Sequence, residues 1–151
     1  MKLRLVAILA LLTPLFLASA ANAENPQHVK KLLSTGTCFR CDLSGADLSG
    51  THLIGVDLRE ANLQGANLTR ANLEGADIRG ANLEGANLTA AFLTNADLKN
   101  ANLDEVNLTE ATVYFANVYG ASMEGMILTD ANILNTAIGV GGETGEIPDW
   151  Y

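Results

Sequence analysis

Two cysteines that lie three residues apart are the side chains in this sequence most able to carry chemistry. Cys38 and Cys41 are the only cysteines of the chain and form a Cys-x-x-Cys. This spacing also occurs in redox-active dithiols, but those sites place the first cysteine at a helix N-terminus, and no helix is expected to follow here. In an exported chain the pair predicts a structural disulfide, with a redox-regulated bridge as the alternative.

Metal binding is the other chemistry that the cysteines could support. A zinc site would need two further ligands, for which His28 and His52 are the candidates. Both histidines are placed unsuitably for that role and are expected to be solvated surface residues. The sequence therefore predicts no metal and no cofactor.

The cysteines stand at the start of a five-residue repeat that continues from Cys41 to Val140. Its third residue is apolar throughout, mostly Leu, and the residue two positions earlier is small, mostly Ala. Leucines five apart form no stripe on a helix and alternate between the two faces of a continuous strand. A common core therefore requires a corner in every repeat, to which a residue such as Gly85 contributes because glycine tolerates a positive φ.

The spacing of outward side chains predicts four repeats per coil. Hydroxyl residues recur every twenty positions, and so do basic and acidic ones (Ser49, Thr69, Thr89, Thr109 and Thr129; Arg59, Arg79 and Lys99; Asp57, Asp77 and Asp97). Residues fifteen apart share no such character. The repeat thus predicts an all-β solenoid of about five stacked coils, in which each coil contacts only its neighbours.

The repeats Ala46–Gly50 and Ala61–Gly65, each A-(D/N)-L-x-x, resemble the pentapeptide repeat family. The resemblance covers about two-thirds of the chain and implies a right-handed quadrilateral β-helix. Some members of that family resemble duplex DNA and bind gyrase. Exported members with a Cys-x-x-Cys at the first coil, from the cyanobacterial periplasm or thylakoid lumen, are the most similar in organisation.

The two ends of the chain differ from the repeat. Residues 1–23 read as a secretory signal peptide, with a basic start, an apolar run and Ala21-Asn22-Ala23 as the cleavage site. Residues 24–37 predict a short helix that caps the first coil, with Asn25 as its N-cap. The β-helix is expected over 38–140 and a tail over 141–151, which either folds back over the last coil or is disordered.

The charge balance excludes several classes of partner. The whole chain has a net charge of −8, and removal of Lys2 and Arg4 with the leader brings it to −10. Direct binding to nucleic acid or anionic lipid is therefore not expected, nor is a membrane association after cleavage. The sequence leaves open whether the protein forms a homo-oligomer.

Three sets of outward residues are candidates for contact with a partner. One face departs from the repeat through apolar side chains (Ile54, Phe92, Tyr114, Phe115 and Leu134), which we call the apolar face. A second has acidic residues in one column, Glu84, Asp104 and Glu124, expected to stack without partners. The third is the Asp57/Arg59, Asp77/Arg79 and Asp97/Lys99 ladder, which is expected to pair within its own face.

These features favour a non-enzymatic protein over an enzyme, because a filled solenoid offers no cleft for a catalytic group. The leading hypothesis is an exported protein-interaction or scaffold module in the periplasm or thylakoid lumen. The first alternative is a redox-responsive protein that acts through Cys38 and Cys41. The second is a DNA-mimicking gyrase binder, which the signal peptide disfavours because it removes the chain from the cytosol.

Overall fold

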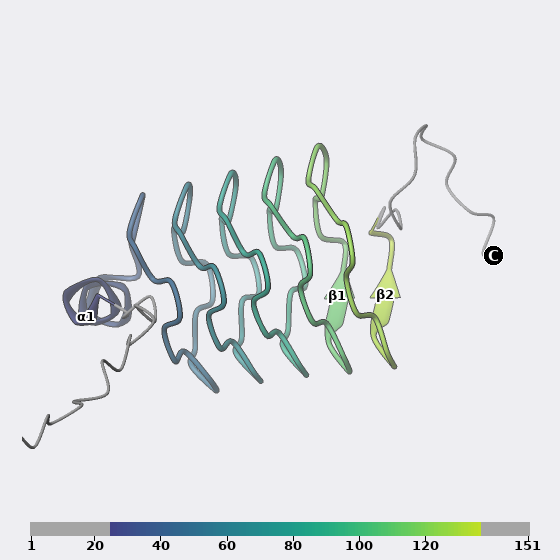
Figure 1. The fold of residues 1–151 in the computed structure, drawn as a ribbon, viewed down its shortest axis with the longest axis horizontal. Helices are drawn as coiled ribbons and strands as arrows, with labels where there is room; N and C mark the ends of the chain where they lie inside the picture. Colours follow the sequence, from purple (N-terminus) through teal and green to yellow (C-terminus); the bar gives the residue numbers. More distant parts are fainter. Residues whose placement is uncertain (1–24, 137–151) are drawn as a thin grey trace, which may run out of the picture.

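A computed structural model describes residues 25–136, which form one helix across the end of a stack of coils (Figure 1). The predicted signal peptide and the predicted tail lie outside these residues. The helix, α1, spans Pro26–Thr35, and the Asn25 side chain accepts hydrogen bonds from the backbone N–H groups of Gln27 and His28. Gly36 ends it in the left-handed conformation (φ 66°) that favours glycine. Leu32 is the buried residue of α1, and it covers the core of the first coil.

The coils stack in parallel with a period of twenty residues. Single-residue bridges join positions twenty apart from Thr37 and Asp57 to Asn107 and Ile127. Two strands are long enough to name, β1 (Thr112–Tyr114) and β2 (Asn132–Leu134), and they pair in the same register. Each side of a coil turns a corner after a few residues, so most sides hold only one fully paired residue. The parallel bridges therefore carry the β-structure that the sequence predicts, with few continuous strands.

Backbone hydrogen bonds explain the fixed register. The N–H of Leu63 donates to the Asn82 carbonyl of the next coil at 2.7 Å, and Asn82 donates back to Ala61 at 2.9 Å. Gly65 donates to Glu84 at 2.9 Å, and Ala66 closes the corner by donating to Leu63 at 3.0 Å. Four of the five N–H groups in a repeat are thus satisfied, which a buried backbone requires.

The inward assignment of the third and first residues is confirmed. Leucine or isoleucine at position three is buried from Leu43 to Leu108, and alanine at position one is buried between them. Each buried leucine contributes about 2 kcal/mol relative to exposure. Toward the C-terminal end Val113 and Val118 replace leucine, and the axial void there is only about 10 Å³. The interior is thus filled with side chains and is too tight for a ligand.

Every corner places its fifth residue in the left-handed region, whether or not that residue is glycine. From Arg40 to Asn135 each fifth residue has a φ between 50° and 71°. Asparagine, aspartate and glycine tolerate this conformation, whereas a bulky residue such as Phe115 (φ 55°) adopts it at a cost of about 1–2 kcal/mol. The corner thus depends on the coil geometry and not on glycine alone.

The first repeat begins one unit earlier than the sequence pattern indicates. Thr37 bridges Asp57, and Arg40 has the corner conformation, so residues 36–40 form a repeat with the order Gly-Thr-Cys-Phe-Arg. Cys38 takes the leucine position, twenty residues before Leu58, and is buried. The solenoid therefore starts at Gly36, directly where α1 ends, and no linker separates the cap from the coils.

A lysine at an inward position tests the fold. Leu83→Lys places a charge in the middle of the filled core and should lower the free energy of unfolding by several kcal/mol. Glu84→Lys, the matched change at the neighbouring outward position, should alter it by at most about 0.5 kcal/mol. Thermal unfolding of both variants measures the difference, and equal melting shifts would refute the inward and outward assignment.

Candidate functional site

Cys38 and Cys41 form a disulfide at the junction of α1 and the first coil. Cys38 occupies the third position of its repeat and Cys41 the first position of the next, so both point into the core across one corner. They are 0% and 3% exposed. The bridge therefore takes the place of a leucine–alanine contact, such as Leu58 with Ala61, in the coil nearest to α1.

α1 rests on this junction through His28. The backbone N–H of Asp42 donates to His28 Nδ1 at 3.0 Å, and the Asp42 carbonyl oxygen lies 3.2 Å from the same nitrogen. The carbonyl oxygen of His28 lies 3.4 Å from Cys38 Sγ. Neither cysteine stands at a helix N-terminus, the placement that lowers the pKa of the attacking thiol in redox enzymes. The arrangement suits a buried bridge under a cap.

The outward Asp or Asn at position two of most repeats has a local structural role that the sequence did not predict. Its side-chain oxygen accepts a hydrogen bond from the backbone N–H two residues later, as Asn82 does from Glu84 at 3.1 Å and Asn102 from Asp104 at 3.0 Å. This Asx turn closes the corner from outside, as Ala66 and its equivalents close it from inside. The signal in the sequence was that most repeats have either Asp or Asn at this position.

Two of the three predicted pairs of the charged ladder form within its own face. The Arg59 side chain donates two hydrogen bonds of 2.8 Å to Asp57, and that of Arg79 donates two of 2.7 and 2.6 Å to Asp77. The prediction is wrong for Asp97 and Lys99, since within residues 25–136 it is only the backbone N–H of Lys99 that bonds to Asp97, and not its side chain. Each arginine also lies 3.6 Å from the aspartate of the next coil, Asp77 and Asp97 respectively. These guanidinium groups hold the pKa values of Asp57 and Asp77 below their ordinary range.

Aromatic rings stand at both ends of the basic column in this ladder. The guanidinium carbon of Arg59 lies 5.5 Å from the centroid of the Phe39 ring, and Lys99 Nζ lies 5.6 Å from that of Tyr119. Such cation–π contacts contribute about 0.5–1 kcal/mol at exposed sites. The charged side chains of the basic column thus contact acidic and aromatic neighbours on the same face, and we assign the column a structural role.

The acidic column does not stack without partners, which corrects the expectation for Asp104. Where the corner needs an acceptor at position two, Ser122 replaces Asn, and its hydroxyl donates to Asp104 Oδ1. The backbone N–H of Glu124 donates to the same oxygen at 2.7 Å. These two donors lower the pKa of Asp104. Asp104 therefore supplies the Asx acceptor for the next coil, and in this column the carboxylates of Glu84 and Glu124 are without a partner within residues 25–136.

The apolar face is only partly contiguous. Tyr114 and Leu134 are ladder partners in β1 and β2, and the N–H of Phe115 donates to the Leu134 carbonyl at 2.8 Å. Phe92 bridges Thr112 and so lies one diagonal step from Tyr114. Phe92, Phe115 and Leu134 are 49%, 54% and 51% exposed, whereas Tyr114 is half-buried. These four residues form what we call the aromatic cluster.

Ile54 does not join the aromatic cluster. It shares a column with Tyr114, but Glu74 and Thr94 occupy the two intervening coils, because the column repeats every twenty residues. Ile54 is exposed, and as an isolated apolar side chain it needs no explanation. It therefore serves as a matched control for the cluster.

Comparison with known proteins fits the repeat that the geometry defines. The family profile described as "Pentapeptide repeats" matches eight copies over residues 41–80 and 76–113. A solved pentapeptide repeat protein from the Arabidopsis thaliana thylakoid lumen is 30% identical, with 77% of this chain and 70% of that chain covered and a TM-score of 0.43. The chain belongs to the pentapeptide repeat family. Family members form right-handed β-helices, consistent with the four repeats per coil seen here.

Two further solved members are similar to this pentapeptide repeat protein. The protein Rfr23 from the cyanobacterium Cyanothece 51142 is 26% identical, with 74% of this chain and 92% of that chain covered and a TM-score of 0.45. QnrB1, a plasmid-mediated fluoroquinolone resistance protein, is 18% identical, with coverages of 64% and 59% and a TM-score of 0.41. Comparison with curated proteins gives no match.

Within residues 25–136 of this pentapeptide repeat protein, no three His, Cys, Asp or Glu side chains gather in a way that could hold a metal ion. Over the same residues, no helix is both long and apolar enough to cross a bilayer.

The Arg–Asp ladder predicts a specific pH dependence. Asp77 has a lowered pKa in the folded protein, so its contribution to stability is complete above the unfolded value of about 3.9. That contribution is lost as the pH falls through the folded pKa. Asp77→Asn keeps the Asx acceptor but removes the charge, so its free energy of unfolding should be lower than that of the wild type by under about 1 kcal/mol at pH 7. This deficit should shrink as the pH falls below about 3.9 and through the folded pKa. Chemical unfolding between pH 7 and pH 2 measures this, with Glu84→Gln as the control, and a deficit that stays constant would contradict the assignment.

The disulfide predicts a local effect of reduction. A bridge that closes so short a loop contributes at most about 2 kcal/mol in the chain-entropy model. Reduction should therefore speed amide hydrogen exchange in residues 26–35 far more than in residues 61–110. The double variant Cys38→Leu, Cys41→Ala restores the core pair of the other coils and should keep the cap protected under reducing conditions.

Protein purified from its own compartment should have both thiols blocked in mass spectrometry. Rapid turnover in an insulin-reduction assay would contradict the structural role of the bridge and favour an oxidoreductase.

Proposed function

We propose that this pentapeptide repeat protein is an exported, non-enzymatic interaction module that binds a protein partner through the aromatic cluster. Members of the family are generally structural or interaction modules and often mediate protein contacts. In this proposal the protein is a rigid right-handed β-helix of about five coils that works in the periplasm or thylakoid lumen. The leader-like residues 1–23 and the Cys38–Cys41 bridge support an oxidising compartment.

The observation that carries the proposal is Phe115. Its backbone has a φ of 55°, a conformation that costs a bulky residue about 1–2 kcal/mol, while its ring is 54% exposed. Among the twenty corner residues from Arg40 to Asn135, Phe115 is the one large apolar side chain. Backbone strain that is not offset by burial of the side chain in the fold is typical of functional sites.

The other members of the cluster fit the same purpose. Phe92 stands at position two, where Asn or Asp would close the corner with an Asx turn, so the fold loses an acceptor there. Tyr114 and Leu134 stand at position four on neighbouring coils, where most other repeats have a polar side chain. Aromatic side chains on a rigid surface are common anchors of protein interfaces. The rigid coils would present these anchors with little loss of conformational entropy on binding.

A second function, redox-responsive regulation, is favoured by one specific contact. The carbonyl oxygen of His28 in α1 lies against Cys38 Sγ, so the seat of the cap includes the bridge itself. Reduction would then loosen α1 and expose the first coil. The hydrogen-exchange experiment above separates the two roles, because a regulator must also change its binding when the bridge is reduced.

Removal of the aromatic anchors tests the proposed function. The triple variant Phe92→Asn, Tyr114→Thr, Leu134→Asn places residues that the repeat uses elsewhere, so the solenoid should stay folded and become slightly more soluble. Affinity capture from the protein's own compartment should lose its specific partner, a drop of at least tenfold in bound material. Ile54→Asn, an exposed apolar residue outside the cluster, should change nothing. Capture that survives the triple change would show the cluster to be incidental, and Glu84 and Glu124 would be tested next.

The single variant Phe115→Asn separates binding from folding. Asparagine tolerates the left-handed corner, so the melting temperature should stay equal or rise by a few degrees. Binding should nevertheless weaken, because the ring is lost. A fall in stability would indicate that Phe115 serves the fold, and the argument from strain would then be wrong.

A further inference from the structure

The corner that carries Phe115 closes its backbone differently from the regular corners of the solenoid. At most corners the first residue of a repeat donates directly to the carbonyl oxygen of the third residue of the repeat before it, as Ala111 does to Leu108 at 2.9 Å. Ala116 donates instead to the side-chain hydroxyl of Thr136, twenty residues later, at 3.0 Å. A side chain of the next coil therefore takes part in the Phe115 corner.

The Thr136 hydroxyl lies between two backbone groups that bond to each other in a regular corner. It is 3.1 Å from the Val113 carbonyl oxygen, which corresponds to the regular acceptor, and 3.3 Å from that of Leu134. The hydroxyl accepts a hydrogen bond from Ala116 and can donate its proton to either carbonyl. Position one holds a small residue, mostly Ala, in the other repeats, and a methyl group cannot make these bonds. The corner is thus held open by a hydroxyl group.

A threonine at position one does not open a corner by itself. Thr51 stands at the same position of its repeat, and its hydroxyl donates to the Leu48 carbonyl of its own corner at 2.6 Å. Its backbone N–H still donates to that carbonyl at 3.3 Å, so the direct bond is kept. Thr51 thus bonds within its own corner, whereas Thr136 reaches the preceding coil.

The open corner coincides with the two named strands, β1 and β2, which lie side by side in Figure 1. On most sides only the residue at position two is paired, and an Asx turn follows it. Thr112, at position two of this side, has no side-chain carbonyl for such a turn. Strand pairing continues to Tyr114 and Leu134, and Phe115 donates to the Leu134 carbonyl at 2.8 Å. Three members of the aromatic cluster thus lie on or next to the only strands named within residues 25–136.

We propose that Thr136 is a positioning residue of the aromatic cluster. Its hydroxyl holds the Phe115 corner open and so fixes Tyr114, Phe115 and Leu134 in the arrangement that the partner binds. This inference rests on the proposed function, in which the cluster binds a protein. Thr136 acts through the backbone of the cluster, and a cluster that is fixed before binding loses less conformational entropy when the partner binds.

Nuclear magnetic resonance tests the geometry directly. Thr136→Ala places the residue that most repeats have at position one, so the regular hydrogen bond from Ala116 to Val113 should form and the melting temperature should change by at most a few degrees. A scalar coupling across that hydrogen bond should be absent in the wild type and appear in the variant. Thr136→Ser keeps the hydroxyl and should resemble the wild type. A coupling already present in the wild type, or absent from Thr136→Ala, would overturn the proposal.

A capture experiment measures the consequence for binding. The same extract of the protein's own compartment is applied to immobilised wild type and variants, and the probe is the protein that wild type retains and the triple variant F92N/Y114T/L134N loses. Thr136→Ala should weaken its retention about fivefold, the factor that one ordinary hydrogen bond contributes, because the corner must reopen on binding. Thr136→Ser should restore it.

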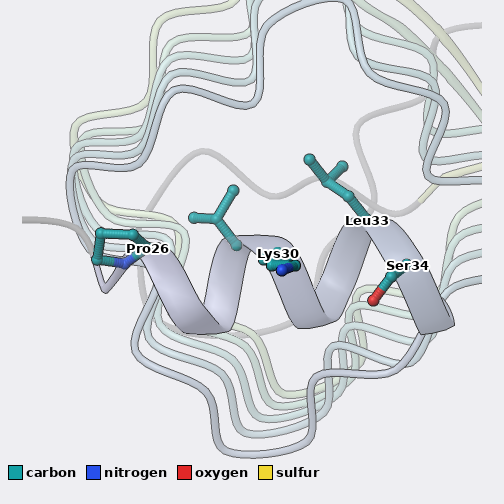
Figure 2. Close-up of a pocket in the computed structure, with 5 residues that line it drawn as sticks. Pro26, Lys30, Leu33 and Ser34 are labelled. Atoms are coloured by element: carbon teal, nitrogen blue, oxygen red, sulfur yellow. The ribbon is translucent and has the colours of Figure 1, made fainter.

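Two variants serve as matched controls. Thr51→Ala removes a hydroxyl at position one that bonds only within its own corner. Leu33→Asn removes an apolar side chain that is 55% exposed, close to the 54% of Phe115. Leu33 lies on α1, beside an open hollow of about 420 Å³ at the other end of the described coils from β2 (Figures 1 and 2). Both controls should retain the probe as wild type does.

The capture experiment separates the failure of this inference from that of the proposed function. A triple variant that retains every captured protein would contradict the proposed function, and the role of Thr136 in binding would fall with it. A probe that the triple variant loses and Thr136→Ala retains in full would leave the proposed function standing and overturn the positioning role alone. Weakened retention in Thr136→Ser equal to that in Thr136→Ala would also overturn it, because the hydroxyl would then not be the group that matters.

Discussion

Backbone hydrogen bonding between successive coils, in a register of twenty residues, is the constraint on which the rest of this structure depends. Each coil forms backbone hydrogen bonds both with the coil before it and with the coil after it, as Leu63, Asn82 and Ala61 illustrate. This register places chemically similar side chains in straight columns, so that any outward substitution meets the residues twenty before and after it. It also leaves the first coil without a preceding coil to bond to. The columns govern the surface chemistry, and the open side of the first coil explains why α1 lies directly before Gly36 and covers it.

Because similar side chains stack in columns, a residue that departs from the repeat is compensated by a residue in a neighbouring position. Stacked aspartates at 57, 77 and 97 would repel one another at cross-strand distance, and Arg59 and Arg79 relieve this by bonding to two aspartates each. Where Ser122 replaces the corner asparagine, Asp104 in the adjoining column supplies the missing acceptor. The Cys38–Cys41 bridge follows the same logic inside the core, since it replaces a leucine–alanine pair in the coil that lies against α1. The charged ladder, Asp104 and the cysteine pair, which are candidate functional residues in the sequence, thus each stabilise the repeat locally.

The period of five and the spacing of twenty could be predicted from the sequence because the same positions of every repeat are buried and therefore need the same residue types. The inward leucines, the parallel coils and the ends of α1 at Asn25 and Gly36 all follow from residue types. The first repeat was missed because Gly36–Arg40 has neither Ala nor Leu, although Cys38 stands twenty residues before Leu58. The pairing of Asp104 was missed because it depends on a serine in the next coil, and sequence patterns that treat each column separately do not register such exchanges.

The same regularity explains why the fold reveals so little about activity. A filled interior offers no cleft, and the repeat specifies inward positions and corners while leaving position four almost free. Functional residues should therefore be those that deviate from the repeat pattern without stabilising the fold. Asp104 is a departure that the next corner requires, whereas Phe115 adds strain at a corner where asparagine or glycine would relieve it. Phe115 and the apolar side chains beside it are thus departures that the adjoining corners do not require, and for this reason the aromatic cluster is the surface that we propose for binding.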